Sequence, residues 1–477
     1  MKRRQVDIAI IGAGSAGLYA LGKVRASGRS FVLIDGGELG TTCARVGCMP
    51  SKAMIQVAED FHRRRIFDRC GIEGGEGLRL DIPEALEYVR DLRDTFVDRV
   101  LAHSTDSLDG EHFIQGQARF LSPEEIEVDG MHIQARRFIV ATGSRPLVPA
   151  QWQPLGEHIL TTDNLFEQPD LPERMAVIGL GVIGLELGQA LARWGIEVSG
   201  FEMREVIGEI GDAEVNRRAI DILGRDLDLH LGAAAELEPA GDGVRVVAGE
   251  QRLEVQRVLA CLGRVPNVAG LGLENLGLEL DARGLPPFDP QTMQVADLPL
   301  FLAGDVTGQR PVLHEAGDEG RIAAINALAD SPRRFRRKVP MTILFTDPEI
   351  CRVGTPLDRL PEADTIVGEV ALAPVGRALI MGRNRGLIRV YARRRDGCLL
   401  GAEMITPRAE NLAHLLAWAM EQGLGVGDLL RMPFYHPVLE EALQAALYQA
   451  YAEVDAKNEG PITELRPWDD QQDDAWR

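Results

Sequence analysis

The sequence is poor in the features that mark secreted, membrane-spanning and nucleic-acid-binding proteins. Cysteine accounts for only six of the 477 residues, which is too few for the disulfide framework of a secreted domain. Basic residues number 52 against 72 acidic ones, so the net charge is −20. This balance argues against binding to nucleic acid or to an anionic membrane surface. No apolar run approaches the roughly 18 residues of a membrane span. We therefore expect neither nucleic acid nor membrane among the partners.

The amino terminus resembles a signal peptide only superficially. Lys2, Arg3 and Arg4 precede an apolar stretch, but Asp7 and several glycines interrupt it. No small-residue cleavage pattern is evident. We interpret the stretch as the first strand of a domain that begins near Met1, and with no targeting peptide evident we expect a cytoplasmic protein.

Length and composition predict a globular chain of about three domains. Hydrophobic residues make up 45% and charged residues 26% of the chain, as in ordinary globular proteins. Proline and polar residues concentrate between Pro146 and Pro172, and glycine and proline between Leu280 and Pro290. These stretches indicate junctions between domains.

The first motif is a strand, a glycine turn, a helix and a second strand. An apolar run at residues 6–11 leads into Gly12, Gly14 and Gly17, a helical pattern follows, and the next strand ends in Asp35. In a dinucleotide-binding unit the glycines allow a tight turn, close approach of the backbone to the pyrophosphate, and helix–strand packing. The acid at the strand end accepts hydrogen bonds from the ribose.

The same motif recurs later in the chain. Gly179, Gly181 and Gly184 follow a second apolar strand, and the acid Glu202 again lies 18 residues after the third glycine. One such motif could be an ordinary glycine-rich turn, but two complete ones predict two dinucleotide sites, for FAD and a nicotinamide nucleotide. Glu202 would repel a 2′-phosphate and so favours NAD over NADP. Arg204 lies close enough to weaken that preference.

Two cysteines five positions apart form the next motif. Cys43 and Cys48 lie in a short loop that leads into a helix, with Pro50 in its first turn. The helix dipole and Lys52 are expected to lower the pKa of a neighbouring thiol, which favours a reactive pair. Two buried, inert cysteines are the alternative, and a metal site lacks further ligands at zinc spacing. The other cysteines are isolated and are expected to be structural: Cys70, Cys261, Cys351 and Cys398.

Thiol chemistry needs a proton acceptor, and a histidine near the carboxyl terminus is a candidate. His436 precedes a predicted helix that has Pro437 at its start and Glu440 and Glu441 in its first turn. Acids stabilise the first turn of any helix. Alternatively, one of them orients the imidazole and raises its basicity. Spacing alone leaves both interpretations open.

Taken together, these motifs resemble the class I pyridine nucleotide–disulfide oxidoreductases, and most closely their dihydrolipoyl dehydrogenases. The matching segments run from residue 7 to about residue 445: GAGSAG, TTCARVGCMPSK, ATGSRP, GLGVIGLELG, GRVPN, LFLAGDVTG, LHEAGDEG and HPVLEEA. The resemblance implies an α/β protein with two Rossmann-like dinucleotide-binding domains, for FAD and NAD, and a C-terminal α+β dimerisation domain. The expected boundaries are 1–150 for the first part of the FAD domain, 151–278 for the NAD domain, 279–338 for a central segment of the FAD domain, 339–458 for dimerisation and 459–477 for an acidic tail.

The resemblance also implies roles for the reactive side chains. Cys43 would be the interchange thiol that reacts with the substrate, and Cys48 the charge-transfer thiolate beside the flavin. His436, oriented by Glu441, would act as acid–base catalyst on the cysteine pair of the partner subunit, which makes a homodimer necessary. No metal is implied. Lys52 and Glu186 would form a pair beside the flavin.

The cofactor positions are implied in the same way. FAD would contact Gly12, Gly14, Gly17, Asp35, Thr42, Lys52, Ala118, Gly143, Asp305 and Ala316. NAD would contact Gly179, Gly181, Gly184, Glu202 and Gly263.

The implied reaction is oxidation of dihydrolipoamide to lipoamide by NAD⁺ through a Cys43–Cys48 disulfide. Lipoamide would be free or carried on a separate acyltransferase or carrier chain. Phe345 stands where tyrosine is common in the family, and Arg45 where asparagine is usual. Because Arg45 lies inside the redox loop, another small disulfide reduced with NAD(P)H is an alternative. A regulatory flavoprotein without lipoamide activity is a second alternative. The absence of a C-terminal cysteine pair disfavours a mercuric reductase.

Overall fold

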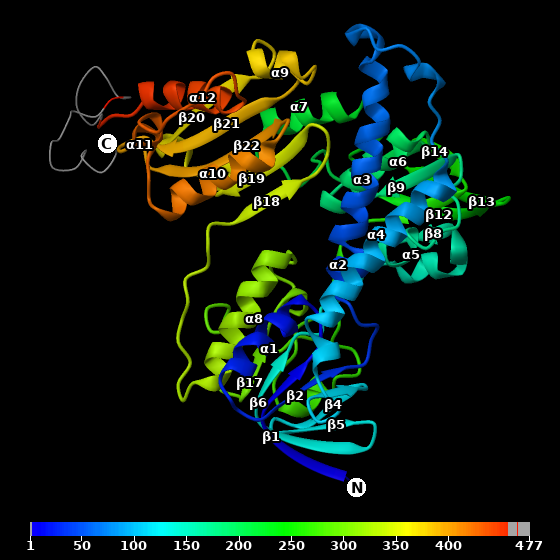
Figure 1. Cartoon of the computed structure of the whole chain (residues 1–477), viewed down its shortest axis with the longest axis vertical. Coiled ribbons are helices and arrows are strands. Elements are labelled where there is room, and N and C mark those ends of the chain that lie inside the picture. Colours follow the sequence, from blue (N-terminus) through cyan, green and yellow to red (C-terminus); the bar gives the residue numbers. More distant parts are fainter. Residues whose placement is uncertain (1, 457–464, 466–477) are drawn as a thin grey trace. The chain divides into compact units, whose positions relative to one another are not determined.

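The computed structural model describes residues 2–456 and Leu465. Within it the chain forms two compact units (Figure 1). Unit 1 comprises residues 1–54, 81–171 and 259–337, and unit 2 comprises residues 55–80, 172–258 and 338–477. Helix α3 (Cys48–His62) and strand β15 (Arg257–Ala260) run from one unit into the other. Apart from Leu465, the predicted acidic tail lies outside the described residues, and the predicted domain boundaries stay predictions.

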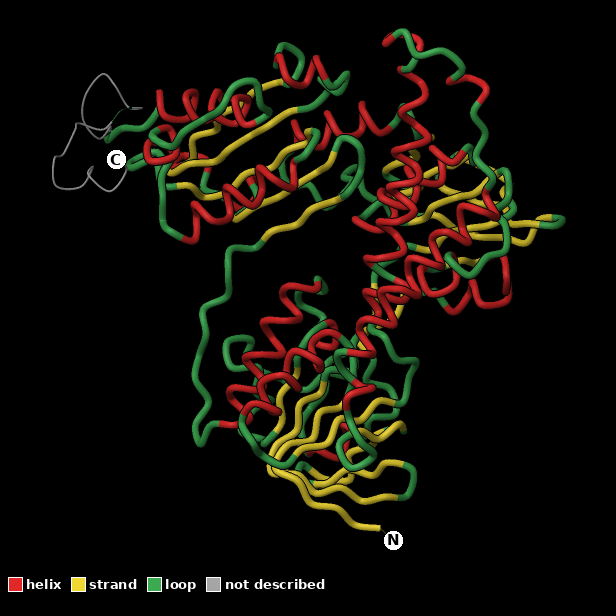
Figure 2. The backbone as a smooth tube through the Cα atoms, in the orientation of Figure 1, coloured by secondary structure: helices red, strands yellow, loops and turns green. Residues whose placement is uncertain are grey.

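Unit 1 is built on a seven-stranded sheet (Figure 2). Strand β1 pairs with β2 on one side and with β6 on the other, and both pairings are parallel. Strand β2 also pairs with β3, and β6 also pairs with β17, again in parallel. Strands β4, β5 and β6 form an antiparallel meander. The first glycine motif thus lies in a Rossmann-like sheet, as predicted. The strands are β1 (Lys2–Ile11), β2 (Phe31–Asp35), β3 (Phe113–Gln115), β4 (Ala118–Ser122), β5 (Glu125–Val128), β6 (Met131–Val140) and β17 (Leu300–Leu302).

Both faces of this sheet are buried, which explains why the last four residues of β1, Ile8–Ile11, are all apolar. Val6, Ala9 and Ile11 point into one hydrophobic core, whereas Ile8 and Ile10 point into the other. The remaining elements of unit 1 are α1 (Ser15–Ala26), α2 (Thr42–Val46), α4 (Ile82–Ala102), α5 (Thr162–Leu165), α8 (Leu313–Leu328), β7 (Ser144–Pro146), β8 (Ile159–Leu160) and β16 (Arg264–Pro266).

Helices α1 and α8 pack closely in the second of these cores. A Cβ on Gly320 of α8 would lie 2.2 Å from the carbonyl oxygen of Ala16, so only glycine permits this approach. The residue before Gly320, Glu319, has a buried carboxylate that accepts hydrogen bonds from the Gly304 amide at 2.8 Å and from the Arg337 guanidinium at 2.9 Å. Helix α8 therefore secures the turn after β17, where Asp305 lies.

The first half of unit 2 repeats the strand–glycine turn–helix–strand pattern. Strands β9, β10 and β11 are parallel, and β12, β13 and β14 form a separate antiparallel sheet. The bounds are β9 (Arg174–Ile178), α6 (Val182–Trp194), β10 (Glu197–Glu202), α7 (Ala213–Leu223), β11 (Asp228–Leu231), β12 (Ala235–Ala240), β13 (Gly243–Ala248) and β14 (Gln251–Val255).

The C-terminal half of unit 2 is α+β, as the resemblance implied. Its antiparallel sheet has the order β18-β19-β22-β21-β20, and α10 and α12 share a hydrophobic core with it. The bounds are β18 (Met341–Leu344), β19 (Glu349–Gly354), β20 (Thr365–Ala371), α9 (Gly376–Ile380), β21 (Leu387–Arg393), β22 (Leu399–Thr406), α10 (Ala409–Glu421), α11 (Val426–Leu430) and α12 (Glu440–Ala452).

Short 3₁₀ helices complete the described chain. They are η1 (Arg63–Ile66), η2 (Asp68–Cys70), η3 (Gly75–Gly77), η4 (Thr105–Ser107), η5 (Ala150–His158), η6 (Leu273–Leu276), η7 (Asp305–Thr307), η8 (Leu357–Arg359) and η9 (Glu362–Asp364). In this part of the chain, no helix combines the length and apolarity needed to cross a bilayer.

Candidate functional site

The three glycines of the first loop occupy three different environments. A Cβ on Gly12, at φ +110°, would lie 2.3 Å from the Ala141 carbonyl oxygen, and one on Gly17 would lie 1.9 Å from the Gly12 carbonyl oxygen. The nearest atom to a Cβ on Gly14 would be 3.9 Å away. The outer glycines are therefore required for the turn and for helix packing, while open space lies over the middle one. This is the form of a pyrophosphate-binding loop at a helix N-terminus.

The acid at the end of β2 is held against this loop. One carboxylate oxygen of Asp35 accepts the Ala13 amide at 2.5 Å, and the other accepts the Gly37 amide at 2.7 Å. The position next to the loop is where a ribose hydroxyl acceptor is needed.

The second loop has the same construction. Gly179 has a φ of +94°, and a Cβ on Gly181 would meet no atom within 4 Å. Glu202 is buried and accepts the Leu180 amide at 3.0 Å and the Arg204 amide at 3.2 Å. The Arg204 Nε lies 3.6 Å from the same carboxylate. Both loops fit a dinucleotide, and the second retains an acid where the ribose would lie.

Asp305 lies in a polar network at the start of η7. Ser144 donates a hydrogen bond to its carboxylate at 3.0 Å, and Arg264 Nε donates to the Ser144 hydroxyl at 2.7 Å and lies 3.9 Å from the carboxylate. The network joins the turn after β6, where Gly143 has φ +68°, to the turn after β17. Contacts of Asp305, Gly143, Ala118, Ala316 and Gly263 with a cofactor stay predictions.

The cysteine pair lies where α2 passes into α3. Cys43 is half-buried in α2 and Cys48 is exposed at the start of α3, and none of the six cysteines forms a disulfide in this structure. A hydrogen bond between the two thiols, together with burial, raises the pKa of Cys43, and Lys52 opposes the rise. The lowered thiol pKa expected from the helix and Lys52 is therefore not found at Cys43, because the hydrogen bond with Cys48 and burial both favour the protonated thiol.

The residue that begins α2 is strained. Thr41 has φ +66° and ψ +146°, a combination that favours glycine. Its side chain is buried and its hydroxyl accepts the Ala44 amide at 3.2 Å, which caps the helix that carries Cys43. The neighbouring Thr42, a predicted FAD contact, is exposed.

This strain predicts an unusual order of stability. Thr41→Ala removes the capping hydroxyl and keeps the Cβ at positive φ, whereas Thr41→Gly removes both. We expect the glycine variant to be more stable than the alanine variant by about 1–2 kcal/mol, as measured by urea unfolding. At the exposed Thr95 in α4 the order should be reversed, because alanine favours a helix interior over glycine. The same order at both positions would contradict strain at Thr41.

Arg45, the unusual residue between the cysteines, forms an ion pair. Its guanidinium donates to the Glu38 carboxylate at 2.5 Å and to the Glu38 carbonyl at 3.1 Å. Its charge is thus largely neutralised by an exposed acid three residues before Thr41.

The histidine motif lies in unit 2 and is exposed. His436 Nδ1 lies 2.8 Å from Glu441 Oε1, and the other Glu441 oxygen accepts the Val438 amide at 3.0 Å. The hydrogen bond with His436 lowers the pKa of Glu441. His436 is 81% exposed in the single chain. Glu441 is thus the acid that contacts the imidazole, and a proton on Nδ1 would leave Nε2 as a solvent-facing acceptor.

Lys52 and Glu186 belong to different units, and their pairing stays a prediction. Glu186 is buried in α6 and accepts the Phe345 amide at 2.9 Å. This contact needs only the backbone of Phe345, so a phenylalanine in place of the usual tyrosine preserves it.

Sequence reasoning missed the surroundings of Cys43. The thiol lines a cavity of about 520 Å³ together with side chains of α1 and α4, among them Tyr19, Arg25 and Arg99. The i, i+3, i+4, i+7 spacing predicts that one helix face carries Phe96, Arg99, Val100 and His103. The sequence alone does not reveal that this face meets the cysteine loop.

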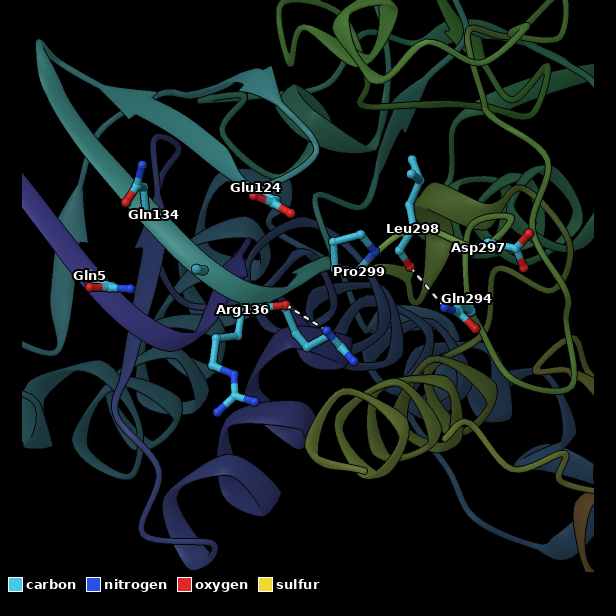
Figure 3. A pocket seen from close by; sticks show the side chains of 10 residues that line it. Gln5, Glu124, Gln134, Arg136, Gln294, Asp297, Leu298 and Pro299 are labelled. Carbon is cyan, nitrogen blue, oxygen red and sulfur yellow. Dashed lines mark hydrogen bonds between the residues drawn. The ribbon is translucent and has the colours of Figure 1, made fainter. Parts of the chain in front are cut away.

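A second cavity, of about 490 Å³, lies away from this chemistry (Figure 3). Its lining includes Gln5, Glu124, Arg136 and Asp297, and shares no residue with the glycine loops or the cysteine pair. Two of the polar side chains drawn there bond to backbone carbonyls: Gln294 donates to Leu298 at 2.9 Å and Arg137 to Arg136 at 3.0 Å. No group of three histidine, cysteine or acidic side chains in the described chain could hold a metal ion.

Comparison with known proteins places these features in a family. Residues 6–320 match the model described as pyridine nucleotide-disulphide oxidoreductase, and residues 340–447 match its dimerisation domain. The chain is 33% identical to a dihydrolipoyl dehydrogenase of Thermus scotoductus over 457 residues, covering 92% of this chain and 96% of that one. It is 30% identical to the enzyme of the same name from Pseudomonas aeruginosa, covering 94% and 97%.

Solved structures share the fold. LpdA from Mycobacterium tuberculosis superposes with a TM-score of 0.81 at 25% identity, covering 94% of this chain and 99% of that one. The HOCl-induced flavoprotein disulfide reductase RclA from Escherichia coli, as its Cu(II) complex, has a TM-score of 0.82 at 23% identity, covering 93% and 99%. The predicted family and fold class are confirmed. The dimerisation domain indicates a homodimer. The chain has two glycine loops of the dinucleotide-binding form and a pair of adjacent cysteine side chains, and it matches both family models. It therefore belongs to the pyridine nucleotide-disulphide oxidoreductases and is an FAD-dependent enzyme that uses NAD(H).

Proposed function

We propose that this oxidoreductase converts dihydrolipoamide and NAD⁺ to lipoamide and NADH through a redox disulfide between Cys43 and Cys48. The observation that carries the proposal is the hydrogen-bonded cysteine pair, with Cys43 open to a cavity large enough for a small disulfide. The curated relatives named dihydrolipoyl dehydrogenase support it.

The two loops would hold the cofactors. FAD would lie on Gly12, Gly14 and Gly17 with Asp35 at its ribose, and NAD on the second loop with Glu202. The remaining FAD and NAD positions named from the resemblance would complete these two sites. When bound, FAD supplies two-electron transfer between the cysteine pair and the nicotinamide.

The thiol step follows from the chemistry of the pair. A substrate thiolate attacks Cys43 Sγ, a substrate–Cys43 bond forms, and the Cys43–Cys48 bond breaks with Cys48 leaving as thiolate. The second substrate thiol then attacks the substrate sulfur of this mixed disulfide and releases Cys43. Two electrons pass from the substrate to the cysteine pair, and two thiol protons are released.

His436 would accept the proton of the attacking thiol. Its Nδ1 is engaged by Glu441, so Nε2 is the atom that exchanges the proton. His436 and Tyr435 are both exposed by about four-fifths in the single chain. This exposure supports a role in the partner subunit's site, because a catalytic imidazole needs surroundings that position the reacting thiol.

The test is a steady-state assay of the purified homodimer with dihydrolipoamide and either NAD⁺ or NADP⁺. We expect turnover with NAD⁺. No turnover with either nucleotide, alongside NAD(P)H-dependent reduction of another small disulfide, would overturn the lipoamide assignment in favour of that alternative. Binding of FAD without turnover of any disulfide would instead indicate a regulatory flavoprotein.

The nucleotide preference should depend on Glu202. Glu202→Gln keeps an acceptor for the Leu180 amide but removes the charge that repels a 2′-phosphate. We expect the ratio of kcat/KM for NAD⁺ to that for NADP⁺ to fall by about tenfold, since one lost charge repulsion at close range is worth about 1.4 kcal/mol. Arg204→Gln serves as the matched control and should move the ratio in the opposite direction. An unchanged ratio in the Glu202 variant would contradict a role at the ribose.

A further inference from the structure

The five-stranded sheet β18-β19-β22-β21-β20, which we call the dimerisation sheet, carries a row of charged side chains on one face. The row consists of four cross-strand neighbours: Glu369 on β20, Arg389 on β21, Glu403 on β22 and Arg352 on β19. Tyr391 lies two residues after Arg389, so its side chain points to the same face. Val390 between them is buried in the hydrophobic core that this sheet shares with α10 and α12. The row therefore lies on the face opposite to that core.

Glu403, in the middle of the row, holds the loop of residues 203–212 that joins β10 to α7, which we call the β10–α7 loop. One oxygen of the Glu403 carboxylate accepts the Gly211 amide at 2.8 Å and the Asp212 amide at 3.1 Å. The other oxygen accepts the Leu357 amide at 3.2 Å. Glu403 is 1% exposed, and burial raises its pKa. A buried carboxylate is a poor source of stability, but its backbone partners here fix one position of the loop.

Asp212, the last residue of this loop, receives further contacts from the sheet. Its carboxylate caps α7 by accepting the Glu214 amide at 2.9 Å. Arg389 Nη1 donates to one oxygen of the same carboxylate at 2.5 Å, and the Tyr391 hydroxyl donates to the other at 2.8 Å. Asp212 and Tyr391 are both fully buried. The end of the β10–α7 loop is therefore fixed to the dimerisation sheet as well as to α7.

The start of the β10–α7 loop is tied to the second glycine motif. The loop follows Glu202, whose carboxylate accepts the Leu180 amide at 3.0 Å. Within the loop, the Gly208 amide donates to the Leu180 carbonyl at 2.8 Å. Leu180 lies between Gly179 and Gly181, the turn expected to hold the pyrophosphate of NAD. A displacement of the loop would therefore move both this turn and the acid expected at the ribose.

We propose that Glu403, Arg389 and Tyr391 are positioning residues for the nicotinamide nucleotide. From the dimerisation sheet they hold the β10–α7 loop, and with it Leu180 and Glu202, in the conformation that binds NAD(H). The inference rests on the proposed placement of NAD on the second glycine loop. A loop released from the sheet is in the binding conformation for only a fraction of the time, and the Kd for the nucleotide rises in inverse proportion to that fraction.

The test is calorimetric titration of the oxidised holoenzyme with NAD⁺. Glu403→Ala removes both contacts with the loop and should raise the Kd for NAD⁺ about tenfold, as for a loop in the binding conformation about a tenth of the time. Glu403→Gln should restore most of the affinity, because its amide oxygen can still accept the two loop amides. Tyr391→Phe removes one hydrogen bond to Asp212 and should raise the Kd about threefold, since the other contacts remain.

Val390→Ala is the matched control. Val390 is fully buried on the same strand as Tyr391 but faces the opposite core. Its truncation should lower the stability of the sheet through the cavity that it leaves, and the Kd for NAD⁺ should stay at the parent value. In the steady-state assay, the KM for NAD⁺ of Glu403→Ala should rise with its Kd, whereas kcat at saturating NAD⁺ and the FAD content should stay near those of the parent.

A Kd for NAD⁺ that is unchanged in Glu403→Ala, or that rises equally in Val390→Ala, would overturn the proposal. If Glu403→Ala does not fold, Tyr391→Phe provides the same comparison with Val390→Ala. The titration needs no dithiol, so failure of dihydrolipoamide oxidation would refute the lipoamide assignment and leave this result standing. An unchanged nucleotide preference in Glu202→Gln would instead refute the placement of NAD on which the inference rests.

Discussion

Replacement of Cys43 by serine is expected to abolish dithiol oxidation, with a loss of at least about 10³-fold in kcat. A serine hydroxyl cannot form a disulfide with Cys48 or a mixed disulfide with the substrate, so no step of thiol exchange is available. The measurement is NAD⁺ reduction by dihydrolipoamide. Cys70→Ser is the matched control, because Cys70 is an exposed, isolated thiol, and it should retain the parent rate.

Thiol titration of the unfolded protein checks the same pair without turnover. Oxidised parent protein should show two fewer reactive thiols than reduced parent protein, and the Cys43→Ser variant should show the same number in both states. An equal count in oxidised and reduced parent protein would contradict the disulfide. Retention of dihydrolipoamide turnover in Cys43→Ser would contradict its role as the interchange thiol.

The second large effect is expected at His436. His436→Gln removes the proton acceptor and should lower kcat by about 10²–10⁴-fold, the range for loss of a general base. Glu441→Gln keeps a hydrogen-bond acceptor for Nδ1 but removes its charge. We expect a smaller loss than in His436→Gln, because the amide oxygen still accepts from Nδ1 but no longer carries the charge that stabilises a protonated imidazole. Full activity of Glu441→Gln would contradict a role of the carboxylate in proton transfer.

A hybrid dimer tests whether the histidine acts across the subunit interface. Homodimers of Cys43→Ser and of His436→Gln should each be nearly inactive. A heterodimer of the two carries one site with both native residues if Cys43 and His436 come from different subunits, and we expect it to have about half the parent activity per dimer. If both residues came from the same subunit, the heterodimer would be as inactive as its parents. The dimer is therefore part of the catalytic proposal, and the experiment separates the two arrangements.

The features predicted most completely from the sequence are the local ones. Gly12 follows from its own φ of +110° and Gly17 from the nearby Gly12 carbonyl oxygen. Asp35 and Glu202 reach their loops because parallel strands bring the end of one beside the start of the next turn. The contact between His436 and Glu441 spans five residues. Spacing alone left open whether a glutamate orients the imidazole or only stabilises the first helical turn.

Other features depended on contacts that residue type and spacing do not specify. The pKa of Cys43 rises because a second thiol shares its hydrogen bond, which outweighs the local helix and Lys52. Thr41 adopts a conformation that no residue propensity predicts for threonine, and tertiary packing must impose it. Arg45, which appeared able to alter the substrate, is engaged by Glu38 instead.

The sequence by itself determined the two dinucleotide loops, the reactive cysteine pair and the histidine motif, because each is encoded over a few residues whose conformational requirements only certain amino acids meet. Only the tertiary structure decided what surrounds Cys43. Arg25 and Ser107 are 82 residues apart in the chain and hydrogen-bonded in space, and Arg99 lies on a helix that no local pattern connects to the cysteines. Long-range packing brings side chains of α1 and α4 to the cavity that Cys43 lines.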